Sequence, residues 1–236
     1  MIYNMDCVMG SKLFLGNDTV DLLIADPPYN LGFGGTKMTK NKKPRFQVIP
    51  NDNLSDREYR RFSLEWLREA YRVLKPGRHI YVFIDWRQYH LLFRLMEYVG
   101  FSIKNCIVWD KKHFGMGWQY RYQHEFVIFA VKKSKKVRRV GSRSASDIWG
   151  IPRINGNKTV HPTEKPNDII SPMIINSSEI NELVVDFFVG SGTVPEVAAT
   201  HNRKFIGFEI DPEHFHTASN RCGFTEQSGG IVNGKT

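Results

Sequence analysis

Cysteine is scarce in this chain, and no pattern typical of a metal site is present. The 236 residues include three cysteines, Cys7, Cys106 and Cys222, which lie far apart without forming a Cys-x-x-Cys pair. His214 and His216 are close together, but no thiol or further histidine lies near them at ligand spacing. We therefore expect neither a disulfide framework nor a zinc site, and we predict no bound metal.

Long hydrophobic runs are also missing. No run reaches the roughly 18 apolar residues that a membrane-spanning helix needs. The N-terminus lacks the charged and apolar regions of a signal peptide. We expect a soluble protein of the cytoplasm that has no membrane partner.

Acidic residues are fewer than basic ones. Lys and Arg number 33 against 24 for Asp and Glu, which gives a net charge of +9, while 41% of the residues are hydrophobic. This is the composition of a globular protein that is long enough to bury a substantial core. The positive charge favours a polyanionic partner such as nucleic acid, although it also serves general solubility.

Short apolar runs alternate with segments of helical periodicity, which predicts an α/β fold with a doubly wound, mostly parallel sheet. Expected strands cover residues 20–25, 79–84, 102–109, 124–131, 183–187 and 204–209. Expected helices cover 87–99, 166–177, 193–202 and 212–221, with a further one that opens at the Ser55–Glu58 capping box and stops at Lys75-Pro76-Gly77. We expect a single domain over residues 1–222, with a short basic insertion at about 132–160 and a flexible tail at 223–236.

The first candidate site is Asp26-Pro27-Pro28-Tyr29, which follows the apolar run of residues 21–25. The exocyclic amine of a nucleobase is a poor nucleophile, and acceptors on its two N–H bonds favour attack and stabilise the charge that develops. The Asp26 carboxylate and the Pro27 carbonyl can be those acceptors, and the two prolines fix the backbone. Tyr29 offers a flat face to a base flipped out of the duplex. Taken alone, the motif also fits an ordinary turn after a buried strand.

A glycine-rich turn about 160 residues later supplies the second candidate site. Asp186-Phe187-Phe188-Val189-Gly190-Ser191-Gly192-Thr193 joins an expected strand to an expected helix, and its glycines permit close approach of a ligand. The next expected strand ends at Glu209, a position from which a carboxylate takes ribose hydroxyls in doubly wound nucleotide folds. The turn matches neither Gly-x-Gly-x-x-Gly nor a Walker A loop, which argues against NAD binding and phosphoryl transfer.

Two basic segments break the α/β pattern. Residues 30–53 follow the first motif directly, and residues 132–160 contain a single acid, Asp147. Runs of this kind are usually solvated loops, but on the rim of a base-flipping site they fit phosphate contacts. The predicted DNA contacts are Lys37, Lys40, Lys42, Lys43 and Arg45 in the first segment, and Lys135, Lys136, Arg138, Arg139 and Arg143 in the second.

The two motifs occur in order with His161-Pro162-Thr163-Glu164-Lys165-Pro166 between them. Together they resemble the β group of DNA amino-methyltransferases, in which the catalytic half precedes the cofactor half. The resemblance covers about residues 3–221. It implies a seven-stranded methyltransferase sheet of permuted motif order, S-adenosylmethionine as cofactor, and methylation of adenine N6 or cytosine N4 in duplex DNA.

The resemblance also implies roles for individual positions. Asp26, Pro27 and Tyr29 would take the flipped base, with Pro28 shaping the turn. Asp6, with Cys7 beside it, resembles the element that contacts the cofactor's adenine, and Lys165 lies where the family approaches the methionine part. Asp186, Phe187, Phe188, Gly190, Ser191, Gly192 and Thr193 would line the same cofactor, and Glu209 its ribose. Phe187 departs from the usual Pro, and Val194 from a common Thr.

Several alternatives stay open. Asp at the first position of the motif favours adenine in this family, whereas N4-cytosine methylation uses the same geometry. An RNA or protein methyltransferase usually has the opposite motif order, and intact Asp26, Tyr29 and Glu209 argue against an inactive DNA-binding homologue. Residues 115–121 with His124 and Glu125 resemble a family segment ahead of the target-recognition region, in which Arg121 and Glu125 also fit a structural ion pair. A homodimer and a cognate restriction endonuclease are candidate partners.

Overall fold

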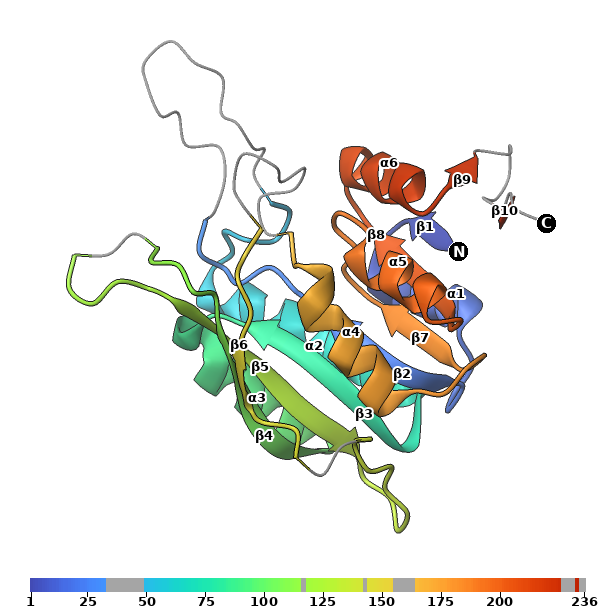
Figure 1. The fold of residues 1–236 in the computed structure, drawn as a ribbon, viewed down its shortest axis with the longest axis horizontal. Coiled ribbons are helices and arrows are strands. Elements are labelled where there is room, and N and C mark those ends of the chain that lie inside the picture. Colours follow the sequence, from blue (N-terminus) through green and yellow to red (C-terminus); the bar gives the residue numbers. More distant parts are fainter. Residues whose placement is uncertain (33–48, 116–117, 142–143, 155–163, 226–231, 234–236) are drawn as a thin grey trace.

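A computed structural model describes residues 1–32, 49–115, 118–141, 144–154, 164–225 and 232–233. Its centre is one sheet with the order β1-β8-β7-β2-β3-β5-β4-β6 (Figure 1). All neighbouring pairs are parallel except the two that involve β5, so β5 alone runs against the other strands of this sheet. The strands of the sheet are β1 (Ile2–Asn4), β2 (Val20–Ala25), β3 (Leu74–Ile84), β4 (Phe101–Asp110), β5 (His124–Lys132), β6 (Ile148–Gly150), β7 (Leu183–Asp186) and β8 (Lys204–Glu209).

Helices cover both faces of the sheet (Figure 1). Trp66, Leu67 and Leu92 of α2 and α3 pack in one apolar cluster, and Ile170, Met173 and Val197 of α4 and α5 pack in another. The helices are α1 (Cys7–Phe14), α2 (Asp56–Val73), α3 (Trp86–Val99), α4 (Asn167–Ser177), α5 (Thr193–Thr200) and α6 (Pro212–Arg221), and a separate antiparallel pair joins β9 (Phe224–Thr225) to β10 (Val232–Asn233).

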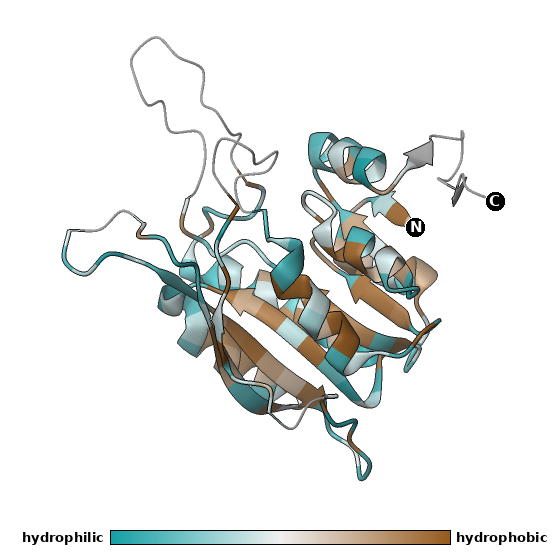
Figure 2. Cartoon of the chain, in the orientation of Figure 1, coloured by the Kyte–Doolittle hydropathy of each residue, from teal (hydrophilic) through white to brown (hydrophobic). Residues whose placement is uncertain are grey.

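The central strand β2 is apolar on both sides because helices lie on both. Leu23 and Ala25 face the α2–α3 cluster, whereas Leu22 and Ile24 face the α4–α5 cluster. This explains why the sequence shows a continuous apolar run here instead of an alternation. Figure 2 shows the same feature as brown strands along the middle of the sheet.

The expected α/β fold is confirmed, and two details are corrected. The sheet has eight strands instead of seven, and two of them are not among the expected strands: β1 pairs with β8, and Ile148–Gly150 of the basic insertion pairs with β4. Helix α2 begins at the Ser55 capping box as expected but ends at Val73, before Lys75-Pro76-Gly77. Leu74 is already extended and pairs with Val20, so the proline and glycine belong to the start of β3, where a missing N–H is tolerated.

None of the helices in the described part of the chain combines the length and apolar character needed to cross a bilayer. Over those residues, no group of three or more His, Cys, Asp or Glu side chains is placed to hold a metal ion.

Candidate active site

The carboxyl ends of the central parallel strands open onto one cavity of about 820 Å³. Asp26 follows β2, Asp186 ends β7 and Glu209 ends β8, and all three line this cavity. Ligands of open α/β sheets bind at this edge. The two motifs, which are about 160 residues apart in sequence, therefore face the same space.

The glycine turn is shaped by tight backbone packing. Gly190 and Gly192 have φ of 53° and 85°, values that side chains disfavour. A Cβ on Gly192 would lie 2.9 Å from Cα of Ala218 in α6, so this residue lets α6 pack against the turn and does not itself line the cavity. The other predicted cofactor residues do line it: Asp6, Cys7, Lys165, Asp186, Phe187, Phe188, Gly190, Ser191, Thr193 and Glu209.

Glu209 connects the end of β8 to the glycine turn. Its Oε2 accepts a hydrogen bond from the N–H of Gly190 at 2.7 Å, and its Oε1 accepts one from the N–H of Asp211 at 2.9 Å. The side chain is buried, and this burial raises the pKa of Glu209 to about 7. The cavity thus holds a carboxylate that is fixed by neutral donors.

Asp186 is a second buried carboxylate of the same kind. Its Oδ1 accepts a hydrogen bond from the N–H of Phe188 at 3.0 Å. Burial, with a smaller contribution from the charges of Asp26 and Glu209, raises the pKa of Asp186 to about 8. Ionisation of these two groups is costly where they are buried, so a cationic ligand beside them would favour their charged forms.

The N-terminal element forms one wall of the cavity. Asp6 caps α1 by accepting hydrogen bonds from the N–H groups of Val8 at 2.9 Å and Met9 at 3.1 Å. Cys7 is buried behind it. Phe188 lies edge-on to Trp66, with ring centroids 5.5 Å apart, so an aromatic surface from α2 continues into the glycine turn.

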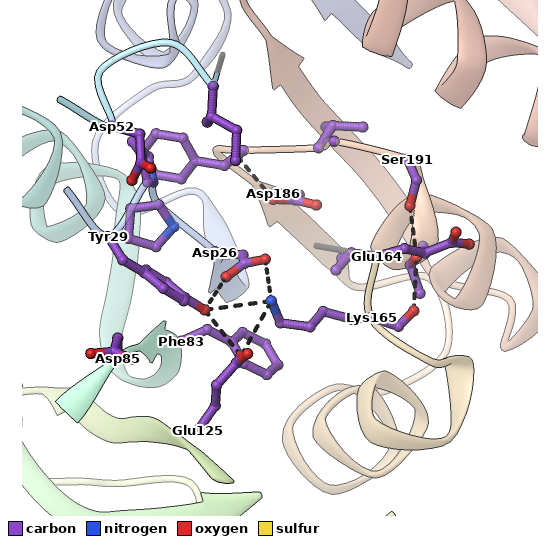
Figure 3. A pocket seen from close by; sticks show the side chains of 18 of the residues that line it. Asp26, Tyr29, Asp52, Phe83, Asp85, Glu125, Glu164, Lys165, Asp186 and Ser191 are labelled. Carbon is purple, nitrogen blue, oxygen red and sulfur yellow. Dashed lines mark hydrogen bonds and ion pairs between the residues drawn. The ribbon is translucent and has the colours of Figure 1, made fainter. Parts of the chain in front are cut away.

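The Asp26-Pro27-Pro28-Tyr29 motif is held by its own side chains, by Lys165 and by α2. The Tyr29 hydroxyl donates to Oδ1 of Asp26 at 2.6 Å, and Lys165 Nζ donates to Oδ2 at 2.6 Å (Figure 3). The Tyr59 hydroxyl donates to the carbonyl of Pro28 at 2.9 Å, which anchors the turn to α2. Burial raises the pKa of Asp26, while Lys165 opposes this rise.

Glu125 at the start of β5 completes the cluster. Its Oε2 lies 3.2 Å from the Tyr29 hydroxyl and 3.5 Å from Lys165 Nζ, and its Oε1 bonds to Lys111. Burial alone would raise the pKa of Glu125, but the ammonium groups of Lys165 and Lys111 lower it to about 2. Two carboxylates and two ammonium groups therefore balance in charge beside Tyr29.

This arrangement corrects one interpretation of the sequence. Glu125 does not pair with Arg121, whose Nε donates to the carbonyl of Gly115 at 2.8 Å. The family resemblance places Lys165 only near the cofactor, but its ammonium group binds the Asp26 carboxylate directly. In the sequence, only the resemblance of His124-Glu125 to a family segment points to Glu125. It does not indicate that the partners of Glu125 are lysines.

A family model described as "DNA methylase", of the N6_N4 type, matches residues 20–220. The chain belongs to the β-group DNA amino-methyltransferases. Relatives of the methylase include the type II methyltransferase M.HpaI of Haemophilus parainfluenzae, 32% identical over 88% of this chain and 69% of that protein. Another is M2.LlaDCHI of Lactococcus lactis subsp. cremoris, 31% identical over 86% of this chain and 82% of that protein.

Solved structures agree with the fold of the methylase. A complex of M1.HpyAVI with S-adenosylmethionine is 26% identical, with a TM-score of 0.67 over 94% of this chain and 98% of that one. The cytosine-N4-specific PvuII DNA methyltransferase has a TM-score of 0.71 over 94% of this chain and 85% of that one. At 19% identity, the PvuII enzyme supports the fold alone.

The basic residues predicted to contact DNA are distributed differently from the expectation. Lys37, Lys40, Lys42, Lys43, Arg45 and Arg143 lie outside the described residues. Lys135, Lys136, Arg138 and Arg139 follow the end of β5, and because β5 is antiparallel this is the edge of the sheet opposite to the cavity. The expectation that these four residues line the rim of the cavity is therefore wrong.

Arg138 shows what such a residue does instead. Its guanidinium group pairs with Glu182 at 2.6 Å and donates to the carbonyl of Ser177 at 2.8 Å. Its backbone N–H donates to the carbonyl of Gly77 at 2.9 Å, near the start of β3. Arg138 therefore ties the insertion to the far edge of the sheet.

We expect the stability of the methylase without its cofactor to depend on pH through Asp186. The pKa of this carboxyl rises from its ordinary value of 3.8 to about 8 in the fold, because the side chain is buried. The stability that the protonated group contributes is therefore full below about pH 4 and is lost as pH rises toward 8. Asp186→Asn should thus gain stability over the wild type between about pH 5 and about pH 8.5, by about 1 kcal/mol or more.

Chemical denaturation at these two pH values measures the difference. Asp147→Asn, which removes an exposed carboxylate away from the cavity, is the control and should show no such trend. A stability difference between Asp186→Asn and wild type that stays constant with pH would contradict the assignment.

Proposed function

We propose that this methylase transfers a methyl group from S-adenosylmethionine to the exocyclic N6 of an adenine flipped out of duplex DNA. The observation that carries the proposal is that Asp26 and Tyr29 share one cavity with the buried carboxylates Asp186 and Glu209. The first pair suits an amine on a flat base. The second pair suits a nucleoside that carries positive charge.

The cavity fits S-adenosylmethionine by charge and by hydrogen-bonding chemistry. The cofactor has a sulfonium, an ammonium group and a ribose with two hydroxyls, and when bound it supplies an electrophilic methyl group. Glu209 would accept from the ribose, because such a carboxylate does so in related nucleotide folds. Asp186 would offset positive charge. M1.HpyAVI, a structural relative that was crystallised with this cofactor, supports the assignment.

Asp26 would orient the target amine and stabilise the charge that develops on it. One N–H of the amine would donate to the Asp26 carboxylate and the other to the Pro27 carbonyl. The ring of Tyr29 would stack on the base, an interaction worth about 1–3 kcal/mol. The bond from Tyr59 to the Pro28 carbonyl keeps the turn in place while this happens.

The choice of adenine rests on the first residue of the motif. An acidic first residue matches the adenine enzymes of the family better than the cytosine enzymes. N4-cytosine methylation is the second candidate, because both bases present an amine with two N–H groups to Asp26 and Pro27. The relatives named as type II methyltransferases support a role beside a restriction endonuclease at a specific site, and a homodimer stays a prediction.

DNA would reach the cavity over the connection between β4 and β5. Phe114, Trp118 and Tyr120 of this connection are exposed, and Trp118 is fully so. Phe114 and Tyr122 line the cavity, and the Arg87 guanidinium lies 5.4 Å from the centroid of the Tyr122 ring. Exposed aromatics beside basic groups at the mouth of a site are the chemistry that unstacked bases bind. They would replace the far-edge lysines and arginines as the DNA contacts.

Nucleosides from DNA treated with the enzyme and S-adenosylmethionine should contain N6-methyladenine by mass spectrometry. Asp26→Ala should lower the rate by about 10²–10³ or more, because a preorganised acceptor is lost at the reacting amine. Its cofactor affinity should remain near that of the wild type. N4-methylcytosine as the sole product would overturn the base assignment and retain the mechanism, whereas normal transfer by Asp26→Ala would remove Asp26 from the mechanism.

Glu209→Gln should weaken S-adenosylmethionine binding in calorimetric titrations. Each hydrogen bond from the ribose to a charged acceptor contributes about 1.5–3 kcal/mol, so a loss of affinity of about tenfold or more is expected. Glu65→Gln is the matched control, because Glu65 is exposed on α2 and pairs only loosely with Arg61. Equal affinities for the two variants would place the ribose elsewhere.

Replacing both Trp118 and Tyr120 by Ala should weaken binding to duplex DNA and slow methylation. The loss of one base–aromatic contact corresponds to about 1–3 kcal/mol, or roughly fivefold to more than a hundredfold in affinity. A comparison variant with Lys135→Gln and Lys136→Gln should bind almost as the wild type does. Fluorescence anisotropy at several salt concentrations measures both, and a larger effect of the lysine pair would show that DNA binds at the far edge.

A further inference from the structure

Both oxygens of the catalytic carboxylate already accept a hydrogen bond. Oδ1 of Asp26 accepts from the Tyr29 hydroxyl at 2.6 Å, and Oδ2 accepts from Lys165 Nζ at the same distance (Figure 3). The Lys165 ammonium group is buried. A target amine that donates an N–H to Asp26 therefore shares the carboxylate with donors that are already bound.

Lys165 and a target amine make opposing demands on Asp26. Both are nitrogen donors that need a carboxylate oxygen at about 3 Å. The ammonium group carries a full charge, and the amine acquires positive charge as it is methylated. Two cations on one carboxylate repel each other, most strongly in a site that excludes water. Productive binding of a base is therefore favoured when Lys165 moves away from Oδ2, which leaves the carboxylate to the amine.

A second acceptor for Lys165 lies within a short movement. Oε2 of Glu125 already forms an ion pair with Lys165 Nζ at 3.5 Å, which is longer than the 2.6 Å bond from Lys165 to Asp26. The other oxygen of Glu125 is bonded to Lys111, so Oε2 faces the cluster. Nζ also lies 4.9 Å from the centroid of the Phe83 ring, and such a face stabilises a cation. Figure 3 shows Asp26, Glu125 and Phe83 around the same ammonium group.

We propose that Lys165 is a positioning residue that moves from Asp26 to Glu125 when the target base enters. This inference rests on the proposed function. While the site holds no base, Lys165 keeps Asp26 ionised and in place. When the base binds, the ammonium group completes its bond to Glu125 and Asp26 accepts the amine in its stead. The cluster keeps its balance of charge in both states.

A static ion pair makes different predictions from this exchange. If Lys165 must move to Glu125, then Glu125→Gln weakens the acceptor and holds Lys165 on Asp26. Removal of Lys165 in that background then frees Asp26, so Lys165→Met should partly repair Glu125→Gln. If both residues only support the fold, the double variant should be no better than the poorer single variant.

Methyl transfer from tritiated S-adenosylmethionine to unmodified genomic DNA measures kcat and KM for the wild type, both single variants and the double variant. Glu125→Gln should lower kcat/KM for DNA by about tenfold or more, and Lys165→Met should restore about threefold or more of that loss, a coupling typical of residues in contact. Lys111→Met is the matched comparison, because Lys111 also binds Glu125 but is not bonded to Asp26. It should give no such repair.

The pH dependence of kcat/KM for Lys165→Met gives a second test, which does not depend on the size of the repair in the double variant. Lys165→Met removes the cation that opposes the raised pKa of Asp26, so the acidic limb of kcat/KM should move to higher pH than in the wild type. Thermal melts and cofactor titrations confirm that each variant folds and binds S-adenosylmethionine. A double variant no better than Glu125→Gln, or an unmoved acidic limb, overturns the exchange. Absence of transfer by the wild type overturns the proposed function instead.

Discussion

The parallel pairing of β2 with β7 brings the two sequence motifs of this protein together. Ile24 lies opposite Asp186 in this pair, so the residues that follow β2 and those that follow β7 emerge at the same edge of the sheet. Neither motif makes a complete site by itself. The first offers an acceptor and an aromatic face, and the second offers a glycine turn with buried carboxylates beside it. Backbone hydrogen bonds between two buried strands hold them at a fixed separation.

The two halves of the cavity differ in their electrostatics. Asp26 and Glu125 are neutralised by lysines, whereas Asp186 and Glu209 are held by backbone N–H groups. In the half around Asp26 and Glu125, a lysine that moves from one carboxylate to the other leaves the net charge unchanged. In the half around Asp186 and Glu209, burial disfavours ionisation of the two carboxyl groups. A cation that enters this half would therefore favour their charged forms. Buried carboxyl groups thus occur in two electrostatic settings in one cavity, and their bonding partners determine the setting.

Much of the architecture could be predicted from the sequence because it depends on local patterns. The buried run before Asp26, the capping box at Ser55 and the glycine turn each specify an element or its end. The three-residue strand β6 has no such pattern, and only its pairing with β4 makes it a strand. The bond from Lys165 to Asp26 spans 139 residues, so it depends on the fold and not on spacing. The expected position of Lys135, Lys136, Arg138 and Arg139 is wrong for a related reason, because it depends on the direction of β5, which a run of apolar residues does not reveal.

The reversed direction of β5 has a consequence for how such an enzyme can diversify. The chain leaves the cavity at Glu125, turns at the far edge after Lys132, and returns along β6 to Arg153, which lines the cavity again. Both ends of this excursion are fixed by strand pairing with β4. Residues can be gained or lost in the turn at modest entropic cost without displacing Glu125 or Arg153. The length of this segment is therefore independent of the positions of Glu125 and Arg153 at the cavity.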